Sequence, residues 1–106
     1  MKTFAEFQII GRVGKIRNVN GVLHISLAAE YGRKNKDGEF QSNPVWNDVP
    51  IFNENTVRWV SENVATGDLV HARGTIRDTR YEKDGQTVYG VTLAARAFDL
   101  LAKKQE

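Results

Sequence analysis

Hydrophobic and polar residues alternate along most of this chain with the two-residue period of β-strands. Five stretches show this alternation, and they begin near Phe7, Gly21, Pro44, Leu69 and Val88. Over residues 53–63 the spacing changes to that of an amphipathic helix, with Asn53 placed to cap its first turn. The pattern therefore predicts three strands, one short helix and two further strands.

Three dipeptides that favour tight turns separate the strands, namely Asn20-Gly21, Asp37-Gly38 and Asp84-Gly85. The first and last predict hairpins that join neighbouring strands. Residues 32–43, around the middle dipeptide, are polar and indicate a flexible loop that carries several cations. Residues 102–106, at the other end of the chain, are expected to be a frayed end.

This order of elements is that of the OB-fold, a partly open barrel. We expect an all-β protein, a five-stranded OB-fold Greek-key barrel with one short α-helix between strands 3 and 4. A chain of 106 residues with even composition is expected to form a single nucleic-acid-binding domain over residues 1–106, with an ordered core at about residues 4–101. The residues predicted to point inward are Leu23, Ile25 and Leu27 in the second strand and Val70, Ala72, Gly74 and Ile76 in the fourth. In the fifth strand, Val91, Leu93, Ala95 and Ala97 are expected to share one face.

The third predicted strand carries aromatic residues on the side that should not face the core. Val45, Val49 and Ile51 share one face of this strand, whereas Trp46 and Phe52 lie on the other. Large apolar side chains on an outward face indicate either a second packing layer or an apolar platform for a partner. The remaining tryptophan, Trp59, is expected to pack in the core or at an interface.

Composition excludes several classes of function. There is no cysteine, and the two histidines, His24 and His71, stand apart without metal-ligand spacing, so neither a cofactor nor a metal site is expected. No nucleophile motif or phosphate loop is present, which argues against an enzyme. No window is apolar enough for a membrane span, and the amino-terminal segment does not resemble a secretory signal, so a cytoplasmic location is expected.

Stacking and electrostatics remain as the chemistry that the sequence offers. Single-stranded nucleic acid is bound by exposed aromatic rings that accept bases and by cations that follow the phosphates. A net charge of +2 is modest, so the placement of the cations matters more than their sum. The predicted DNA-binding residues are the rings Trp46, Phe52, Tyr81 and Tyr31 and the cations Arg12, Lys15, Arg17, Arg33, Lys34, Lys36, Arg73, Arg77, Arg80 and Lys83.

Four segments together resemble the oligonucleotide-binding domain of bacterial single-stranded DNA-binding proteins: FQIIGRVGK, LHISLAAE, DGEFQSNPVWNDVPIF and VHARGTIRDTRYEKDGQ. The resemblance covers about residues 4–101. It implies that Trp46, Phe52 and Tyr81 occupy positions where the family stacks bases. Members usually have a further aromatic after the second strand, where this chain has Tyr31 and Arg33 close together.

The resemblance also implies a biological setting. It predicts a nucleoid-associated protein of bacterial, phage or plasmid origin that acts in replication, repair or recombination as a homo-oligomer, commonly a tetramer and otherwise a dimer. Family members carry a long tail with an acidic tip that recruits replication and repair enzymes, whereas this chain stops at AKKQE. The expectation is therefore either a truncated chain or a protein that protects DNA without tail-borne partners.

Two alternatives stay open at the level of sequence. The length is also that of the short primosomal replication proteins, which share the fold and act mainly through protein partners. In that case Trp46 and Phe52 would be buried against a subunit or a replication protein. RNA binding uses the same stacking physics, and the sequence does not distinguish it from DNA binding.

Overall fold

The computed structural model describes residues 2–105 of the chain. It contains five strands and one helix in the predicted order: β1 (Glu6–Val19), β2 (Val22–Lys34), β3 (Phe40–Ile51), α1 (Glu54–Asn63), β4 (Leu69–Lys83) and β5 (Gln86–Ala102). The strands are longer than the hydrophobic pattern predicted. In particular, β2 and β3 continue as a paired ladder to Lys34 and Phe40, so most of the predicted flexible loop is regular strand.

The strands close into a barrel in the order β1-β2-β3-β5-β4. Neighbouring strands are antiparallel except β3 and β5, which meet in parallel where Ile51 pairs with Ala95. This is the five-stranded OB-fold arrangement, with the helix between β3 and β4, and it confirms the predicted fold class. The turns confirm their sequence signals as well, because Asn20, Gly21, Asp84 and Gly85 all have the positive φ of hairpin turns.

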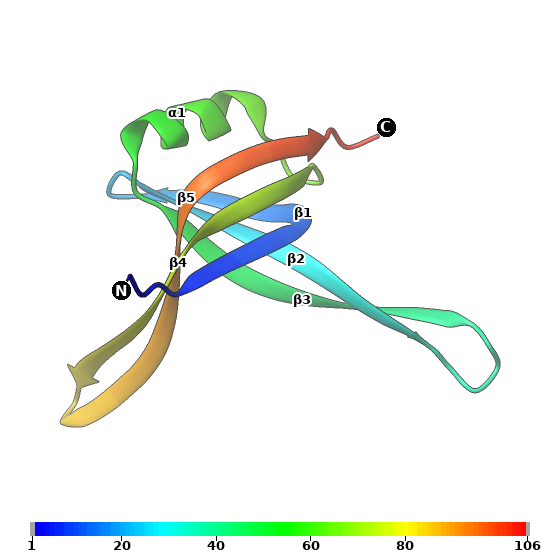
Figure 1. Cartoon of the computed structure of the whole chain (residues 1–106), viewed down its shortest axis with the longest axis horizontal. Coiled ribbons are helices and arrows are strands. Elements are labelled where there is room, and N and C mark those ends of the chain that lie inside the picture. The colour runs from blue at the N-terminus through cyan, green and yellow to red at the C-terminus, as the bar shows by residue number, and fades with distance from the viewer. Residues whose placement is uncertain (1, 106) are drawn as a thin grey trace.

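The core lies inside the barrel and under α1, which covers one end of it (Figure 1). Its fully buried side chains include Ile25, Leu27, Val49, Val70 and Val60, the last of these from the helix. The helix begins as predicted, with the Asn53 side chain accepting hydrogen bonds from the backbone N–H groups of Asn55 and Thr56. Trp59 is 40% exposed, so of its two expected roles core packing is excluded and packing at an interface stays a prediction.

Two predictions about strand faces need correction. Ile76 was predicted to point inward but is exposed, because β4 begins to leave the barrel at this residue. Ala97 was expected on the same face as Ala95, but Phe98 is the next buried residue on that face. The reason is a bulge in β5, where Arg96 has no partner between Ala95, which pairs with Gly74, and Ala97, which pairs with Arg73. Such a bulge moves every later side chain of the strand to the opposite face.

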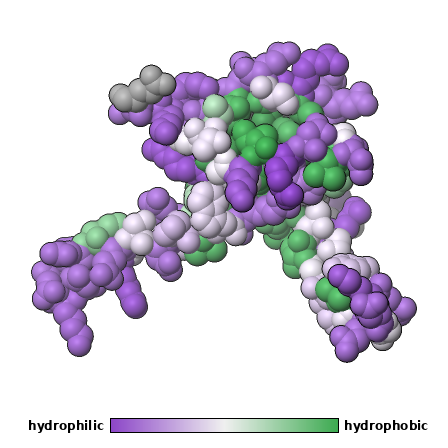
Figure 2. Space-filling view, turned by 180° about the vertical axis from the view of Figure 1, so that it is seen from behind, coloured by the Kyte–Doolittle hydropathy of each residue, from purple (hydrophilic) through white to green (hydrophobic). Residues whose placement is uncertain are grey.

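Two hairpins extend well beyond the barrel, at the end away from α1 (Figure 1). We call residues 30–44 the β2–β3 arm and residues 77–92 the β4–β5 arm. They raise the radius of gyration to 16.1 Å, against about 13 Å for a compact domain of this length. Figure 2 shows the two arms projecting apart from the body, with tips that are mostly hydrophilic.

The carboxyl end of β5 is tied to the barrel through one buried carboxylate, Asp68. Its side chain accepts hydrogen bonds from Lys103 Nζ at 2.9 Å, from the backbone N–H of Lys104 at 2.8 Å and from that of Ala65 at 2.9 Å. The Lys103 ammonium, followed by the two backbone N–H groups, lowers the pKa of Asp68 to about 2. Residues 103 and 104 are thus held in place, which corrects the expectation that these residues belong to a frayed end.

None of the helices within residues 2–105 has both the length and the apolar character that a membrane crossing requires.

Candidate functional site

Trp46 lies on the outer face of the barrel, as its position in the alternating pattern predicted. It is 57% exposed, while Val49 and Ile51 on the opposite face of β3 are fully buried. The indole lies against Gly14 of β1, because a Cβ atom at that glycine would overlap the six-membered ring. A bulge in β1 between Val13 and Ile16 brings Gly14 to this position. The ring is therefore supported from below and open above.

Cations from β1 surround this ring. A hollow beside the indole is lined by two cations, Lys15 and Arg17. Its other lining residues are His24, Ser26, Trp46, Asn47 and Asp48. Lys15 is fixed through its backbone, whose N–H donates to Ser26 Oγ at 2.8 Å, so its side chain is free to reach outward. Arg12 lies in the same cross-strand row as Trp46, since both pair with Ala28 of β2. The structure thus brings Lys15 and Arg17 to the Trp46 ring, whereas the Arg12 guanidinium donates to the Gly67 carbonyl at 3.4 Å.

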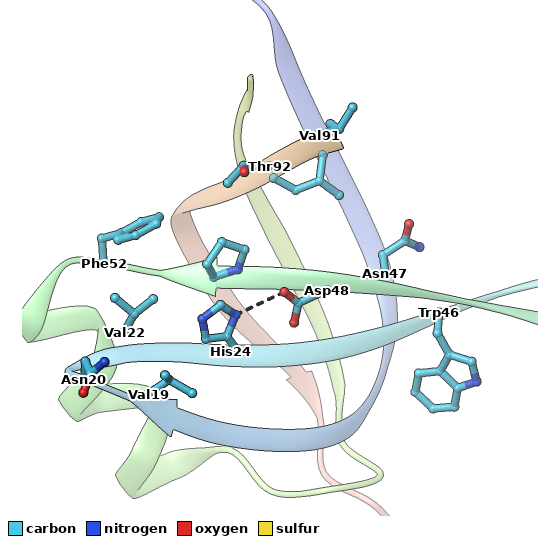
Figure 3. Close-up of a pocket in the computed structure, with 12 residues that line it drawn as sticks. Val19, Asn20, Val22, His24, Trp46, Asn47, Asp48, Phe52, Val91 and Thr92 are labelled. Atoms are coloured by element: carbon cyan, nitrogen blue, oxygen red, sulfur yellow. Dashed lines mark hydrogen bonds and ion pairs between the residues drawn. The ribbon is translucent and has the colours of Figure 1, made fainter. Parts of the chain in front are cut away.

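A cleft of about 710 Å³ continues from Trp46 to Phe52 (Figure 3). Phe52 follows β3 and is 55% exposed, and Val91 and Leu93 of β5 form the opposite side of the cleft. The polar part of the floor is a hydrogen-bonded pair, in which His24 Nδ1 lies 3.1 Å from Asp48 Oδ2. The sequence analysis assigned neither residue a role in binding. We call this space the Trp46–Phe52 cleft.

The two faces of the β2–β3 arm carry different residues. Phe40 pairs with Lys34 and shares the face of Trp46, because the two aromatics are an even number of residues apart on one strand. Phe40 is 70% exposed, and its ring covers Gly32. The sequence analysis missed it because the predicted third strand began at Pro44, whereas β3 starts at Phe40.

Two predicted residues lie on the other face of this arm. Tyr31 pairs with Asn43 and Arg33 with Gln41, at positions of the opposite parity to Trp46. Together with their partners they line a separate hollow. Lys36 is exposed in the turn at the arm's tip. The structure therefore does not bring Tyr31 and Arg33 together with Trp46 on one face.

The β4–β5 arm divides its predicted residues in the same way. Arg80 shares a face with Val91 and Leu93, which line the Trp46–Phe52 cleft, and its guanidinium lies 5.4 Å from the centroid of the Tyr89 ring. Tyr89 is 69% exposed and is a second aromatic that the sequence analysis missed. The other predicted residues of the arm, which occupy its opposite face, are Tyr81, Arg77 and Lys83.

Arg73 lies apart from all of these residues. It is on the outer face of β4, where its cross-strand partners are Gln8 of β1 and Ala97 of β5. In the barrel order, β4 is separated from β3 by β5 on one side and by β1 and β2 on the other. Arg73 is therefore on a different side of the barrel from Trp46.

The chemistry available at this site is stacking, charge and hydrogen bonding. Within residues 2–105 no group of three or more His, Cys, Asp or Glu side chains is arranged to hold a metal ion. The second histidine, His71, makes a hydrogen bond with Gln8 at 3.0 Å, on the side of the barrel where Arg73 lies. Exposed rings with cations beside them can hold the bases and phosphates of an unpaired strand.

Comparison with known proteins identifies a family for this chain. The model of the single-strand binding protein family matches residues 4–101. Among curated proteins, no sequence matches the chain significantly.

Several solved structures have a similar fold. The mitochondrial single-stranded DNA binding protein Rim1 of S. cerevisiae is 25% identical, with a TM-score of 0.73 over 97% of this chain and 100% of its own. A Plasmodium falciparum SSB in complex with ssDNA is 22% identical, with a TM-score of 0.66 over 96% of each chain. The small single-stranded DNA-binding protein of Streptomyces coelicolor is 15% identical, with a TM-score of 0.66 over 93% of this chain and 95% of its own.

Proposed function

This chain belongs to the single-strand binding protein family and binds single-stranded DNA, and we propose that it does so by stacking bases on Trp46 and Phe52 while Lys15, Arg17 and Arg12 neutralise phosphates. Members of the family are non-enzymatic DNA binders. The protein would coat exposed strands without reading a defined sequence, in replication, repair or recombination.

The exposure of Trp46 is the observation that supports this proposal most directly. An indole that is 57% exposed, held against a glycine and flanked by two cations, is poorly explained as packing within one chain. Base stacking on an aromatic ring contributes about 1–3 kcal/mol per base, and every base has a face to stack. Two rings in one cleft therefore offer affinity that does not depend on sequence or on a large net charge.

The arms extend the proposed contact surface beyond the barrel. Phe40 and Lys34 continue the Trp46 face along the β2–β3 arm, and Tyr89 with Arg80 continues the other side of the cleft along the β4–β5 arm. Tyr31, Arg33, Tyr81, Arg77 and Lys83 would contribute only if the strand passed over an arm to its second face. Short oligonucleotides should therefore depend on the first set of residues more than on the second.

Tryptophan fluorescence tests the proposal directly. In a Trp59→Phe variant, Trp46 is the only remaining tryptophan and reports on its own environment. Oligo-dT added at low salt should quench this fluorescence, because a stacked base contacts the indole face. An unchanged signal together with unchanged anisotropy of a labelled oligonucleotide would refute the proposal.

We further propose that the protein forms a homo-oligomer, as a tetramer or alternatively a dimer. Ile10 is 59% exposed on the outer face of β1 although it lies in the middle of a strand. A large aliphatic side chain at such a position favours a subunit interface. Light scattering should give a mass above one chain for the native protein and a smaller mass for Ile10→Glu, while a single-chain mass for the native protein would contradict this assignment.

The alternative of a protein-interaction module makes a different prediction for Trp46. A base-stacking ring must be accessible before DNA arrives, whereas a ring buried by a subunit or partner is not. Iodide or acrylamide should therefore quench Trp46 in the free Trp59→Phe protein. Protection of Trp46 in the free oligomer would favour the interaction module.

A further inference from the structure

The cations near the two proposed stacking rings are unevenly placed. Lys15 and Arg17 line the hollow beside Trp46. Within residues 2–105, in contrast, no Lys or Arg is among the residues that line the Trp46–Phe52 cleft itself. A strand whose bases reach Phe52 brings its phosphates with it, and cations along the path of those phosphates strengthen binding. A cation at the Phe52 end would therefore complete the site.

Arg96 of β5 lies at that end of the cleft. Ile51 and Ala95 pair in parallel, so the residues that follow them, Phe52 and Arg96, leave this pair side by side. Both line a hollow of about 290 Å³, and its other lining residues are Asn53, Ala94 and Ala95. The guanidinium is thus the one charged group among the described residues that line this hollow.

The bulge in β5 sets the position of Arg96. This residue has no partner in β4, whereas Ala95 before it pairs with Gly74. Bulges re-aim a side chain and are frequent beside binding sites. The two strands approach closely here because position 74 is a glycine, where a Cβ atom would overlap the backbone carbonyl of Ala94. The place of Arg96 beside Phe52 therefore follows from how β4 and β5 pair.

The Arg96 guanidinium is available to an anion. Its side chain is exposed, and within residues 2–105 it makes neither an ion pair nor a side-chain hydrogen bond. By contrast, Arg80 pairs with Asp78 and Arg12 donates to the Gly67 carbonyl. A guanidinium without a protein partner can donate two parallel hydrogen bonds to the oxygens of one phosphate.

We infer that Arg96 binds a phosphate of the strand that stacks on Phe52, so that the bound strand leaves the cleft past this ring and along the β5 bulge. The inference rests on the proposed function, because it requires that bases stack in the Trp46–Phe52 cleft. It adds an anion subsite at the end of the cleft away from Lys15 and Arg17, and it gives the β5 bulge a role in binding.

The salt dependence of binding tests this subsite, with an oligo-dT long enough to pass both rings. Arg96→Gln should lower the slope of log K against log salt by about 0.7, the contribution of one phosphate contact. Arg96→Lys keeps the charge and should keep the slope close to native. The matched control is Arg58→Gln, because Arg58 is an exposed cation of α1 that lines none of the hollows at either ring, and it should leave the slope unchanged. The melting temperature of each variant verifies that it folds.

A second measurement locates the strand without relying on charge. The chain has no cysteine, so Arg96→Cys carries a single thiol. An oligo-dT with a thiol-reactive group on its backbone should attach to this thiol, and much less to that of Arg58→Cys.

Three results would each overturn the inference while leaving strand binding intact: a native slope in Arg96→Gln, equal reductions in Arg96→Gln and Arg58→Gln, or equal attachment to the two thiols. Failure of the native protein to bind oligo-dT at all would instead overturn the proposed function and the inference with it.

Discussion

Gly14 and Trp46 come from different strands and depend on each other in space. The indole of Trp46 occupies the volume that a side chain at position 14 would need, and the bulge of β1 opposite Ser26 places Gly14 beneath it. The six-membered ring therefore lies against the barrel at Gly14, while more than half of the Trp46 side chain stays exposed. The position of the proposed stacking ring therefore depends on a glycine of β1, with β2 lying between the two strands, and not on β3 alone.

Replacing the ring itself should weaken binding without unfolding the protein. Trp46→Ala removes an exposed side chain, so its effect on stability should be small, whereas affinity for a short labelled oligonucleotide should fall by about 1–3 kcal/mol. Fluorescence anisotropy measures the affinity and thermal denaturation the stability. The matched control is Trp59→Ala on α1, and an equal loss of affinity in both variants would contradict the assignment.

Gly14→Ala should act on binding through the position of the Trp46 ring. The new methyl group would overlap the indole, which must tilt or move outward and lose its flat support. We expect weaker oligonucleotide binding, by less than in Trp46→Ala, and a changed near-ultraviolet circular dichroism signal. Gly90→Ala is the control, because a Cβ there meets its nearest neighbour at 3.4 Å. Native affinity in Gly14→Ala would show that the ring's support is irrelevant.

The salt dependence of binding should separate the β1 cations from Arg73. Each cation that contacts a phosphate of single-stranded DNA contributes about 0.7 to the slope of log K against log salt. Lys15→Gln and Arg17→Gln should each reduce the slope by about this amount, since both side chains line the hollow at Trp46. Arg73→Gln should leave it unchanged for a short strand. A reduced slope in Arg73→Gln would instead indicate a path around the barrel.

The two faces of the β4–β5 arm predict different effects for its two tyrosines. Tyr89 shares a face with residues that line the Trp46–Phe52 cleft, whereas Tyr81 lies on the opposite face. Tyr89→Ala should therefore weaken binding of a short oligonucleotide by about 1 kcal/mol or more, and Tyr81→Ala should have a smaller effect. With longer strands the difference should narrow, and a larger effect of Tyr81→Ala on short strands would reverse the proposed path.

The buried carboxylate of Asp68 should make stability depend on pH. Its pKa falls from 3.8 to about 2 in the folded protein, so the folded state favours the ionised form. This contribution is fully present above about pH 4 and is lost as the pH falls from about 4 towards 2. Asp68→Asn should lower the melting temperature at pH 7, and the difference from the native protein should shrink over that acidic range.

A control variant separates the effect of Asp68 on stability from that of an exposed carboxylate. Glu82→Gln alters an exposed acid of the β4–β5 arm and should leave the melting temperature close to native at pH 7. If the melting temperatures of native protein and Asp68→Asn differ by the same amount from pH 7 to pH 2, the ionised form of Asp68 does not stabilise the fold.

The part of the fold inside the barrel could be predicted from the sequence. Leu23, Ile25 and Leu27 alternate cleanly because one face of β2 is buried and the other is not, and the same contrast identified Trp46 as an outward residue. Asn20-Gly21 and Asp84-Gly85 marked their turns because both residues of each pair need a positive φ. These signals depend only on residues close together in the sequence, so they can be recognised without knowing the fold.

Only the tertiary structure decided how the proposed binding residues are divided among faces. On the arms neither side of the strand pair is buried, so hydrophobic alternation carries no information there, and Phe40 and Tyr89 could not be separated from Tyr31 and Tyr81. The bulges of β1 and β5 likewise depend on how each strand pairs with its neighbours, and each one moves later side chains to the other face. The sequence alone thus determined the barrel and its exposed Trp46, while strand pairing decided which rings and cations share a surface with it.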